Sequence, residues 1–245
     1  MKKMETQTKY QPRVEMIEGR WAPEAKLWTP YDSGEIAFVS PAFGSNTYRN
    51  VGQEILSKNL KVPTGDYTAS LLNSAYCSDA SNEQGFKNVR DITKRSRLWV
   101  FNTNLWAVIG VYVAQDIDAT GRSQPLNVSD LEKALKGGKE INGIRFSKDG
   151  KIRFAPKGSY NLEYNAPEAF AKDGFVIASC GEEGAEKLGE VSAKFKNKPY
   201  IHGLEVQKGQ TPKQKLSTVF GYVDGLRFDG DYWSDGWSHA FGVLK

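Results

Sequence analysis

The sequence predicts an α+β (mixed α/β) fold in which helices pack on a mixed β-sheet. Three observations favour this class. An amphipathic segment around an Asp-Gly turn predicts a β-hairpin at about 141–155. A strand-helix-strand order predicts a βαβ unit at about 174–206. Capped helical segments alternate with apolar runs elsewhere. For 245 residues we expect one globular domain, 1–245, with a division into two lobes near 120–127 as the alternative.

The first part of the chain predicts strands and helices in turn. Residues 1 to about 20 are polar, which predicts either little order or a loosely held strand. Residues 34–40 form a short apolar segment that Pro41 ends, as expected of a buried strand. Ser45 is a candidate cap for the next helix. Residues 64–77 predict a second helix, and residues 78–88 predict a loop. The inner face of the first helix is predicted from helical spacing to contain Tyr48, Val51 and Ile55.

The most apolar stretch lies near the middle of the chain. Residues 98–101 and 108–114 are apolar on both faces, which is typical of central strands. We predict a turn or bend between them, over residues 103–107. Asn102 and Asn104 interrupt the apolar run at positions of the same parity, so both amides face one side and need buried partners. They either anchor the bend or provide a polar grip inside a pocket.

A short helix precedes the predicted hairpin. Ser129-Asp130-Leu131-Glu132 matches a capping box, and Gly137-Gly138 is expected to end the helix. In the hairpin, a three-residue loop over 148–150 would pair Phe146 with Ile152 and Arg145 with Arg153. That register collects the large apolar side chains on one face, each worth about 2 kcal/mol when buried, and places Gly150 where a left-handed residue is needed. A two-residue Asp149-Gly150 turn would mix Arg and Phe on both faces, so we predict the first register.

The C-terminal part completes the predicted sheet. In the βαβ unit, residues 174–180 and 200–206 are the strands and residues 182–196 the helix. Residues 220–228 and 239–244 predict the last strands. Between them lies a loop rich in Asp and Trp, DGDYWSDGWS.

Composition and charge narrow the functional classes. The net charge is only +4, a weak attraction toward polyanions. The beginning of the sequence has no apolar leader, and the ten-residue apolar run at 105–114 is shorter than the roughly 20 residues of a membrane-spanning helix. Cys77 and Cys180 are the only cysteines, which suggests reduced thiols. We therefore expect a soluble cytoplasmic protein without a membrane partner.

The sequence contains no motif that is typical of a particular enzymatic reaction. A Walker loop, a dinucleotide-binding glycine fingerprint, a zincin helix, paired zinc cysteines and a nucleophile elbow are all absent. Asp116 and Asp118 follow a predicted buried strand two residues apart. Their carboxylates can point the same way to hold a hard cation such as Mg²⁺ or to share acid–base work. The alternative is that both are solvated residues at the start of a loop.

The C-terminal loop offers a second acidic cluster. Asp229, Asp231 and Asp235, with His239 nearby, resemble a calcium loop only superficially, because the run fails the EF-hand pattern. They are interpreted as turn residues, as ligands for Mg²⁺ or Ca²⁺, or as catalytic carboxylates acting with His239. Another hypothesis is a ligand surface on which exposed rings stack against a sugar or base and the Asp residues accept hydroxyl hydrogen bonds. Its rings would belong to Trp233 and Trp237, with Tyr232 beside them.

Two basic clusters complete the candidates. On the predicted hairpin face, Arg145 and Arg153 would repel each other unless an anion lay between them. That anion is either phosphate of a partner or an acidic side chain of this protein. The remaining basic candidates are Lys151 in the hairpin and Lys94, Arg95 and Arg97 before the central strand.

These candidates leave three functional hypotheses. The first is a non-catalytic protein that binds nucleic acid or a nucleotide through the basic hairpin face. The second is a carboxylate-based hydrolase, with or without a divalent metal, that uses Asp116 and Asp118 or the 229–239 loop. The third is a sugar-binding surface at that loop. The sequence leaves open whether the protein is an enzyme and what its oligomeric state is.

Overall fold

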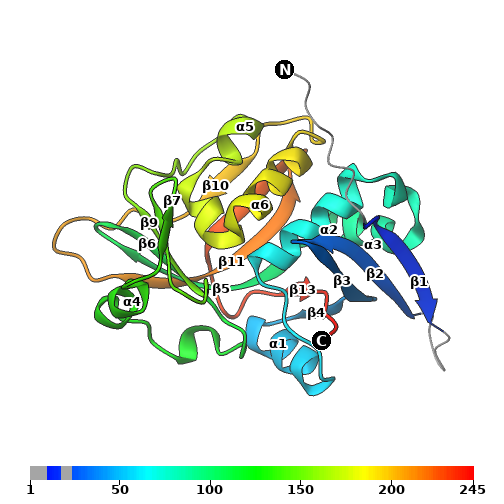
Figure 1. Cartoon of the computed structure of the whole chain (residues 1–245), viewed down its shortest axis with the longest axis horizontal. Coiled ribbons are helices and arrows are strands. Elements are labelled where there is room, and N and C mark those ends of the chain that lie inside the picture. Colours follow the sequence, from blue (N-terminus) through cyan, green and yellow to red (C-terminus); the bar gives the residue numbers. More distant parts are fainter. Residues whose placement is uncertain (1–9, 18–23) are drawn as a thin grey trace.

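The computed structural model describes residues 10–17 and 24–245. Most of its strands form one mixed sheet with helices on both faces, which confirms the predicted α+β class (Figure 1). A separate antiparallel sheet has the order β1-β2-β3, formed by Arg13–Ile17, Glu24–Tyr31 and Gly34–Ser40. Strand β3 matches the strand predicted at 34–40. Of the predicted N-terminal segment, residues 1–9 and 18–20 lie outside the described residues.

The large sheet has the strand order β10-β12-β11-β5-β6-β9-β8-β7, and β13 pairs with both β4 and β5. Neighbouring strands on this path are antiparallel except for β10 and β12, and the single pairing of β13 with β5 is also parallel. The strands are β4 (Phe43–Asn46), β5 (Leu98–Ala107), β6 (Gly110–Gln115), β7 (Lys139–Ile141), β8 (Ile144–Phe146), β9 (Ile152–Pro156), β10 (Tyr200–His202), β11 (Lys213–Tyr222), β12 (Gly225–Tyr232) and β13 (Ser238–Ala240).

Helices cover the two faces of this sheet in different places. Helix α6 crosses in front of β11 in Figure 1, packs against α2 and β12, and helps form the largest apolar core. On the opposite face, α1 covers Trp99 and Phe101, and α4 covers Tyr112 and Phe154. The helices are α1 (Tyr48–Ser57), α2 (Gly65–Cys77), α3 (Gln84–Arg95), α4 (Val128–Leu135), α5 (Pro167–Phe170) and α6 (Gly174–Ser192), with short 3₁₀ turns at Asp79–Asn82 and Gly121–Ser123.

Several predicted helices are confirmed, with different caps. Helices α1 and α2 lie where helical spacing placed them, but α1 begins after Thr47, so Ser45 is not its cap. Helix α4 begins after Asn127, whose side chain accepts a hydrogen bond from the Asp130 backbone, two residues before the predicted cap. Helix α3 starts inside the segment predicted as a loop. None of the helices in the described part of the chain is long and apolar enough to cross a membrane.

The predicted βαβ unit is wrong. Residues 174–180 are the first part of α6, and β10 pairs in parallel with β12 instead. The carboxylate of Asp173 caps α6 by accepting hydrogen bonds from the Phe175 and Val176 backbone. Each of the seven residues after this cap is buried, so the run has no polar face to separate a helix from a strand. Gly181 kinks the helix at a φ of 73°, which is where the predicted strand ended.

The central strand is continuous through the two asparagines. Strand β5 runs without a turn from Leu98 to Ala107, so the bend predicted over 103–107 does not occur. Asn102 and Asn104 are fully buried on the same face of the sheet. Asn102 Nδ2 donates to the carbonyl of Ser179, just before the kink of α6, at 2.9 Å. Asn104 Nδ2 donates to Ser217 Oγ and to the Gly230 carbonyl. The amides therefore hold α6 and β12 against β5.

The hairpin exists, but its predicted register is wrong. Arg145 pairs with Phe154, and Phe146 pairs with Arg153. The Ser147 backbone donates to the Ile152 carbonyl, so the loop is one residue longer than predicted and every side chain of β9 moves to the other face. Both faces are covered, because Phe146 packs in the α6 core while Phe154 packs beneath α4. Gly150 does adopt the expected left-handed conformation, at a φ of 71°.

Candidate functional site

The two hairpin arginines lie on opposite faces of the sheet, and each is neutralised by an internal carboxylate. Arg145 donates to both carboxylate oxygens of Glu132 on α4, at 2.9 and 2.7 Å, and its guanidinium lies over Phe154. These hydrogen bonds, together with one from Tyr112, hold the pKa of Glu132 down at about 2. The anion that neutralises Arg145 is therefore a side chain of this protein, the carboxylate of Glu132.

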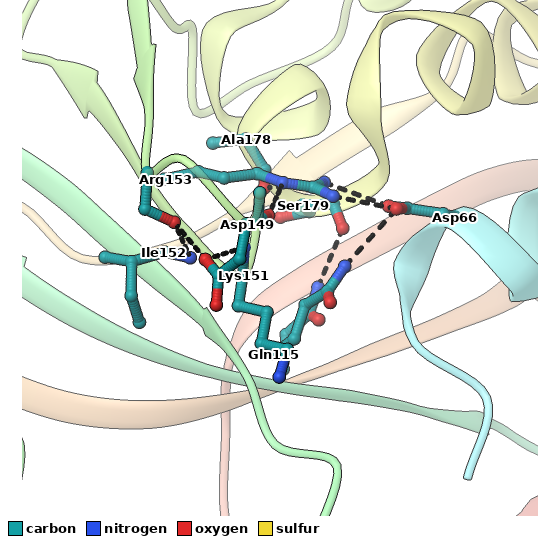
Figure 2. A network of polar contacts seen from close by, with 11 residues as sticks. Asp66, Gln115, Asp149, Lys151, Ile152, Arg153, Ala178 and Ser179 are labelled. Carbon is teal, nitrogen blue, oxygen red and sulfur yellow. Dashed lines mark hydrogen bonds and ion pairs between the residues drawn. The ribbon is translucent and has the colours of Figure 1, made fainter. Parts of the chain in front are cut away.

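Arg153 pairs with a different carboxylate, and this ion pair is more deeply buried than that of Arg145. Its guanidinium reaches from β9 to Asp66 at the start of α2, with hydrogen bonds of 2.9 and 2.7 Å (Figure 2). Further donors of Arg153 contact the carbonyls of Gly150 and Ala178. Because Arg145 and Arg153 point to opposite faces, the structure does not bring them together as a phosphate-binding pair. The exposed Lys151 stays in the hairpin loop, where it lines a cavity described below.

Asp116 and Asp118 have different environments. Asp116 is 9% exposed and accepts three hydrogen bonds, from the backbone and hydroxyl of Thr120 and from the Gly121 backbone. These bonds fold the loop after β6, so this carboxylate anchors a turn. Asp118 is exposed, and only its backbone carbonyl has a partner among the hydrogen bonds found, Gln53. The pair therefore resembles the loop-opening alternative more than a shared acid–base site.

The basic cluster before β5 is divided between two sides of the sheet. Lys94 and Arg95 are exposed at the end of α3. Lys94 lines a cavity of about 560 Å³ together with Arg90, Lys194 and Lys196, beside the turn between β11 and β12. Arg97 instead lies on the opposite face, where it stacks over Phe220 and Tyr232.

That opposite face carries the largest group of predicted site residues. In β12, Leu226 and Phe228 point into the α6 core, so Arg227 and Asp229 point the other way, where neither α1 nor α4 covers the sheet. We call this face and the loop beside it the open strip. It comprises Arg97, Tyr200, His202, Phe220, Tyr222, Arg227, Asp229, Asp231, Tyr232 and Trp233, together with Lys215, whose backbone pairs with Asn104 of the α6 face and whose ammonium group meets Asp231 at the bulged end of β12.

Asp229 and Asp231 in the strip are each paired with a cation. Asp229 is 4% exposed, lies 3.0 Å from His202 Nδ1, and has the Arg227 guanidinium at 3.8 Å. Asp231 lies 2.6 Å from the Lys215 ammonium group. His202 and Asp229 are paired neighbours on β10 and β12, whereas Lys215 of β11 reaches Asp231 beside the bulge between β11 and β12. Both carboxylates are therefore already held by side chains of the protein.

Exposed tryptophans lie at one end of the strip, in the loop between β12 and β13. Trp233 is 57% exposed, and the Lys215 ammonium nitrogen is 3.4 Å from its ring centroid. Trp237, in the same loop, is 66% exposed. Large apolar side chains with this exposure are a common mark of binding surfaces. Asp235 is also exposed in this loop.

His239 lies beside the strip without joining its carboxylates. Its backbone donates to the Arg97 carbonyl, and its Nδ1 is 3.2 Å from Ser96 Oγ. Burial lowers the pKa of its imidazole. Within residues 10–17 and 24–245, no three His, Cys, Asp or Glu side chains gather closely enough to hold a metal ion. The proposed metal role of Asp229, Asp231 and Asp235 therefore stays a prediction without a coordinating cluster.

Sequence reasoning missed most partners of these residues. Lys215, His202 and Arg227 complete the strip, and Asp66 completes the hairpin ion pair. Arg227 was detectable, because it alternates with Leu226 and Phe228 in an amphipathic strand. The others come from distant segments, and no local pattern indicates a pairing over more than 80 residues such as Asp66 with Arg153.

Comparisons with known proteins give one distant similarity. No protein-family model matches the chain, and no curated protein matches it. Among solved structures, the chain is similar to one described under the heading "Accommodation of massive sequence variation in Nanoarchaeota by the C-type lectin fold", with a TM-score of 0.49 and 12% sequence identity. The match covers 83% of this chain and 96% of that chain. A similarity at this level assigns neither a family nor an activity.

Proposed function

We propose that the protein binds a neutral carbohydrate at the Trp233 end of the open strip. The observation that carries this proposal is the combination of exposed indole rings with carboxylates that are already neutralised. An indole face offers a flat apolar surface for the C–H face of a sugar ring. The Asp231–Lys215 and Asp229–His202 pairs beside it offer fixed acceptors and donors for hydroxyl groups.

Existing ion pairs favour a neutral ligand at this end. Asp231 is paired with Lys215 and Asp229 with Arg227, while Arg97 and Arg122 lie over the rings of Tyr232 and Trp233. A phosphate chain would have to compete with the carboxylate already bound to Lys215. A neutral polyhydroxyl ligand avoids this competition, because it can accept from the cation and donate to the carboxylate together.

A glycan array probed with the intact chain tests the proposal, followed by calorimetric titration of any neutral oligosaccharide that binds. We expect Trp233→Ala to weaken binding by about tenfold or more, with a smaller effect for Trp237→Ala. Ile109→Ala is the matched control, since Ile109 is 55% exposed in the turn between β5 and β6. Binding of no neutral glycan, or equal affinity in Trp233→Ala and Ile109→Ala, would refute carbohydrate binding at this loop.

A second candidate is binding of a phosphate-rich partner, nucleic acid or nucleotide, at the cavity beside the turn between β11 and β12. It is favoured by four cations, Arg90, Lys94, Lys194 and Lys196, that share this cavity with one carboxylate, Asp224. Combining Lys94→Glu with Lys196→Glu should abolish binding of a single-stranded oligonucleotide, and wild-type affinity should fall steeply with salt. Unchanged binding in this double variant would exclude the cavity. The hairpin arginines are not proposed for this role, because Glu132 and Asp66 occupy them.

A further inference from the structure

A cavity of about 470 Å³ lies away from the open strip, between the hairpin loop and the start of α2. Its volume falls in the range of small-molecule sites. Segments distant in the sequence meet around it: Tyr31 at the end of β2, Asp66 and Tyr67 of α2, Gln115 and Ile117 at and just after the end of β6, and the hairpin loop. It depends on no residue of the proposed carbohydrate site.

The polar side of this cavity is held rigidly. Arg153 is 5% exposed as a residue, and its guanidinium is fixed by Asp66 and by the carbonyls of Gly150 and Ala178. Gln115 Nε2 donates to Asp66 from below this ion pair, at 3.3 Å (Figure 2). The side chains at this wall are therefore already ordered, which lowers the entropic cost of binding a ligand.

Part of the cavity lining is apolar and aromatic. Leu56, Leu60 and Ile117 line it, and Ile117 is 43% exposed. The rings of Tyr31 and Tyr67 stand 5.0 Å apart in a tilted contact. Burial, followed by the charge of Asp66, raises the pKa of both hydroxyls, so they are neutral donors at neutral pH. This wall suits a flat or apolar molecular body.

The rim of the cavity has unbalanced positive charge. Lys61, Lys151 and Lys245 line it, and none of them forms a salt bridge with a described residue. Of the two carboxylates in the lining, Asp66 is paired with Arg153, and Asp149 accepts from Ser147 and the Lys151 backbone. The lining therefore carries four cations against two carboxylates and is positive overall, with Lys245 also donating to Asn59 Oδ1.

We propose that this cavity binds a small organic anion. Its apolar or aromatic body lies against Leu56, Leu60 and Ile117, and its carboxylate, sulfonate or phosphate group lies among Lys61, Lys151 and Lys245. Lys61 precedes α2 and Lys151 lies in the hairpin loop, so two separate segments supply cations to the charged group, which offsets part of the positive charge of the lining.

Anilinonaphthalene sulfonate is a suitable probe, because its fluorescence rises in an apolar site and it carries one negative charge. We expect saturable binding at one site. Combining Lys61→Ala, Lys151→Ala and Lys245→Ala should weaken it by about tenfold or more. Combining Lys87→Ala, Lys172→Ala and Lys208→Ala removes three exposed lysines elsewhere and should leave it unchanged. Ile117→Trp, which fills the cavity from an exposed position, should also weaken binding.

The uncharged parent compound, phenylnaphthylamine, separates recognition of the anion from simple apolar adhesion, and we expect it to bind at least about tenfold more weakly. Equal affinity for the two probes would overturn the proposal. So would an equal loss in both lysine triple variants, unchanged binding in Ile117→Trp, or no binding to the wild-type chain. Trp233→Ala should leave probe binding unchanged, so failure of the carbohydrate proposal does not affect this test.

Discussion

Replacing Asp66 with Asn should destabilise the fold strongly, because it leaves the Arg153 guanidinium buried without its carboxylate. The two side chains are only 17% and 7% exposed, and their closest N–O distance is 2.7 Å. At that distance the gross attraction is about 6 kcal/mol at an effective dielectric constant of about 20, before desolvation is subtracted. Breaking a buried pair by removing one partner costs about 3–5 kcal/mol. The Gly150 and Ala178 carbonyls still accept from Arg153, so we expect the lower end, about 3 kcal/mol.

The pair can be tested by thermal and urea denaturation of the single and double variants. A loss of about 3 kcal/mol should lower Tm by roughly 6–12 °C for a chain of this size. Arg153→Met should cost less, because Asp66 borders the cavity and water can hydrate it. The double variant should cost less than the sum of the singles, by about 1 kcal/mol or more. Asp118→Asn changes an exposed carboxylate and is the control. If Asp66→Asn and Asp118→Asn lower Tm equally, the ion pair does not hold the hairpin to α2.

Three further predictions follow from other contacts. The pKa of Glu132 is depressed to about 2, so the stability that this carboxylate contributes is complete above about pH 4.5 and is lost as the pH falls toward 2. Glu132→Gln should therefore flatten the dependence of Tm on pH in that window, and an unaltered dependence would contradict the pairing with Arg145. Asn102→Ala removes the buried donor to the Ser179 carbonyl and should cost about 1–3 kcal/mol in urea unfolding. A change below about 0.5 kcal/mol would mean that the amide does not secure α6. Gly65→Ala places a Cβ 2.0 Å from the Ser179 carbonyl oxygen and should prevent the close approach of α2 to α6. The variant should then lose cooperative thermal unfolding, whereas a native-like Tm would show that this contact is loose.

The sequence predicted local elements well where one face was clearly apolar. Helix α1 was located by the spacing of Tyr48, Val51 and Ile55, and β3 by a short apolar run that ends at Pro41. The prediction failed where burial is complete. Residues 174–180 are apolar all round in α6, as a doubly covered strand would be, so periodicity could not distinguish the two. The turn predicted within β5 failed because Asn102 and Asn104, which looked like breaks, are hydrogen-bonded inside the core.

The candidate site was predictable in its residue types and less so in its grouping. Exposed Trp233 and Trp237 beside Asp229 and Asp231 were indicated by the composition of one loop, since these residues are local in sequence. The partners of these carboxylates were not indicated, because Lys215 and His202 come from other strands. Which side chains pair across a sheet depends on the order of the strands. Here that order includes a parallel pair, β10 with β12, which no local sequence pattern predicts.

The hairpin shows how one residue of loop length changes a functional conclusion. With a three-residue loop, Arg145 and Arg153 would share an exposed face and attract an anion from outside. Because the loop also includes Lys151, the two arginines point to opposite faces of the sheet. Arg145 pairs there with Glu132 on α4, and Arg153 pairs with Asp66 on α2. The cation that stays available is then Lys151 itself, at the rim of the cavity beside Asp66. The exposed positive charge of the hairpin therefore lies at a pocket and not on the sheet surface, and the apolar residues in the same lining make a small organic anion a better fit than a polyanion.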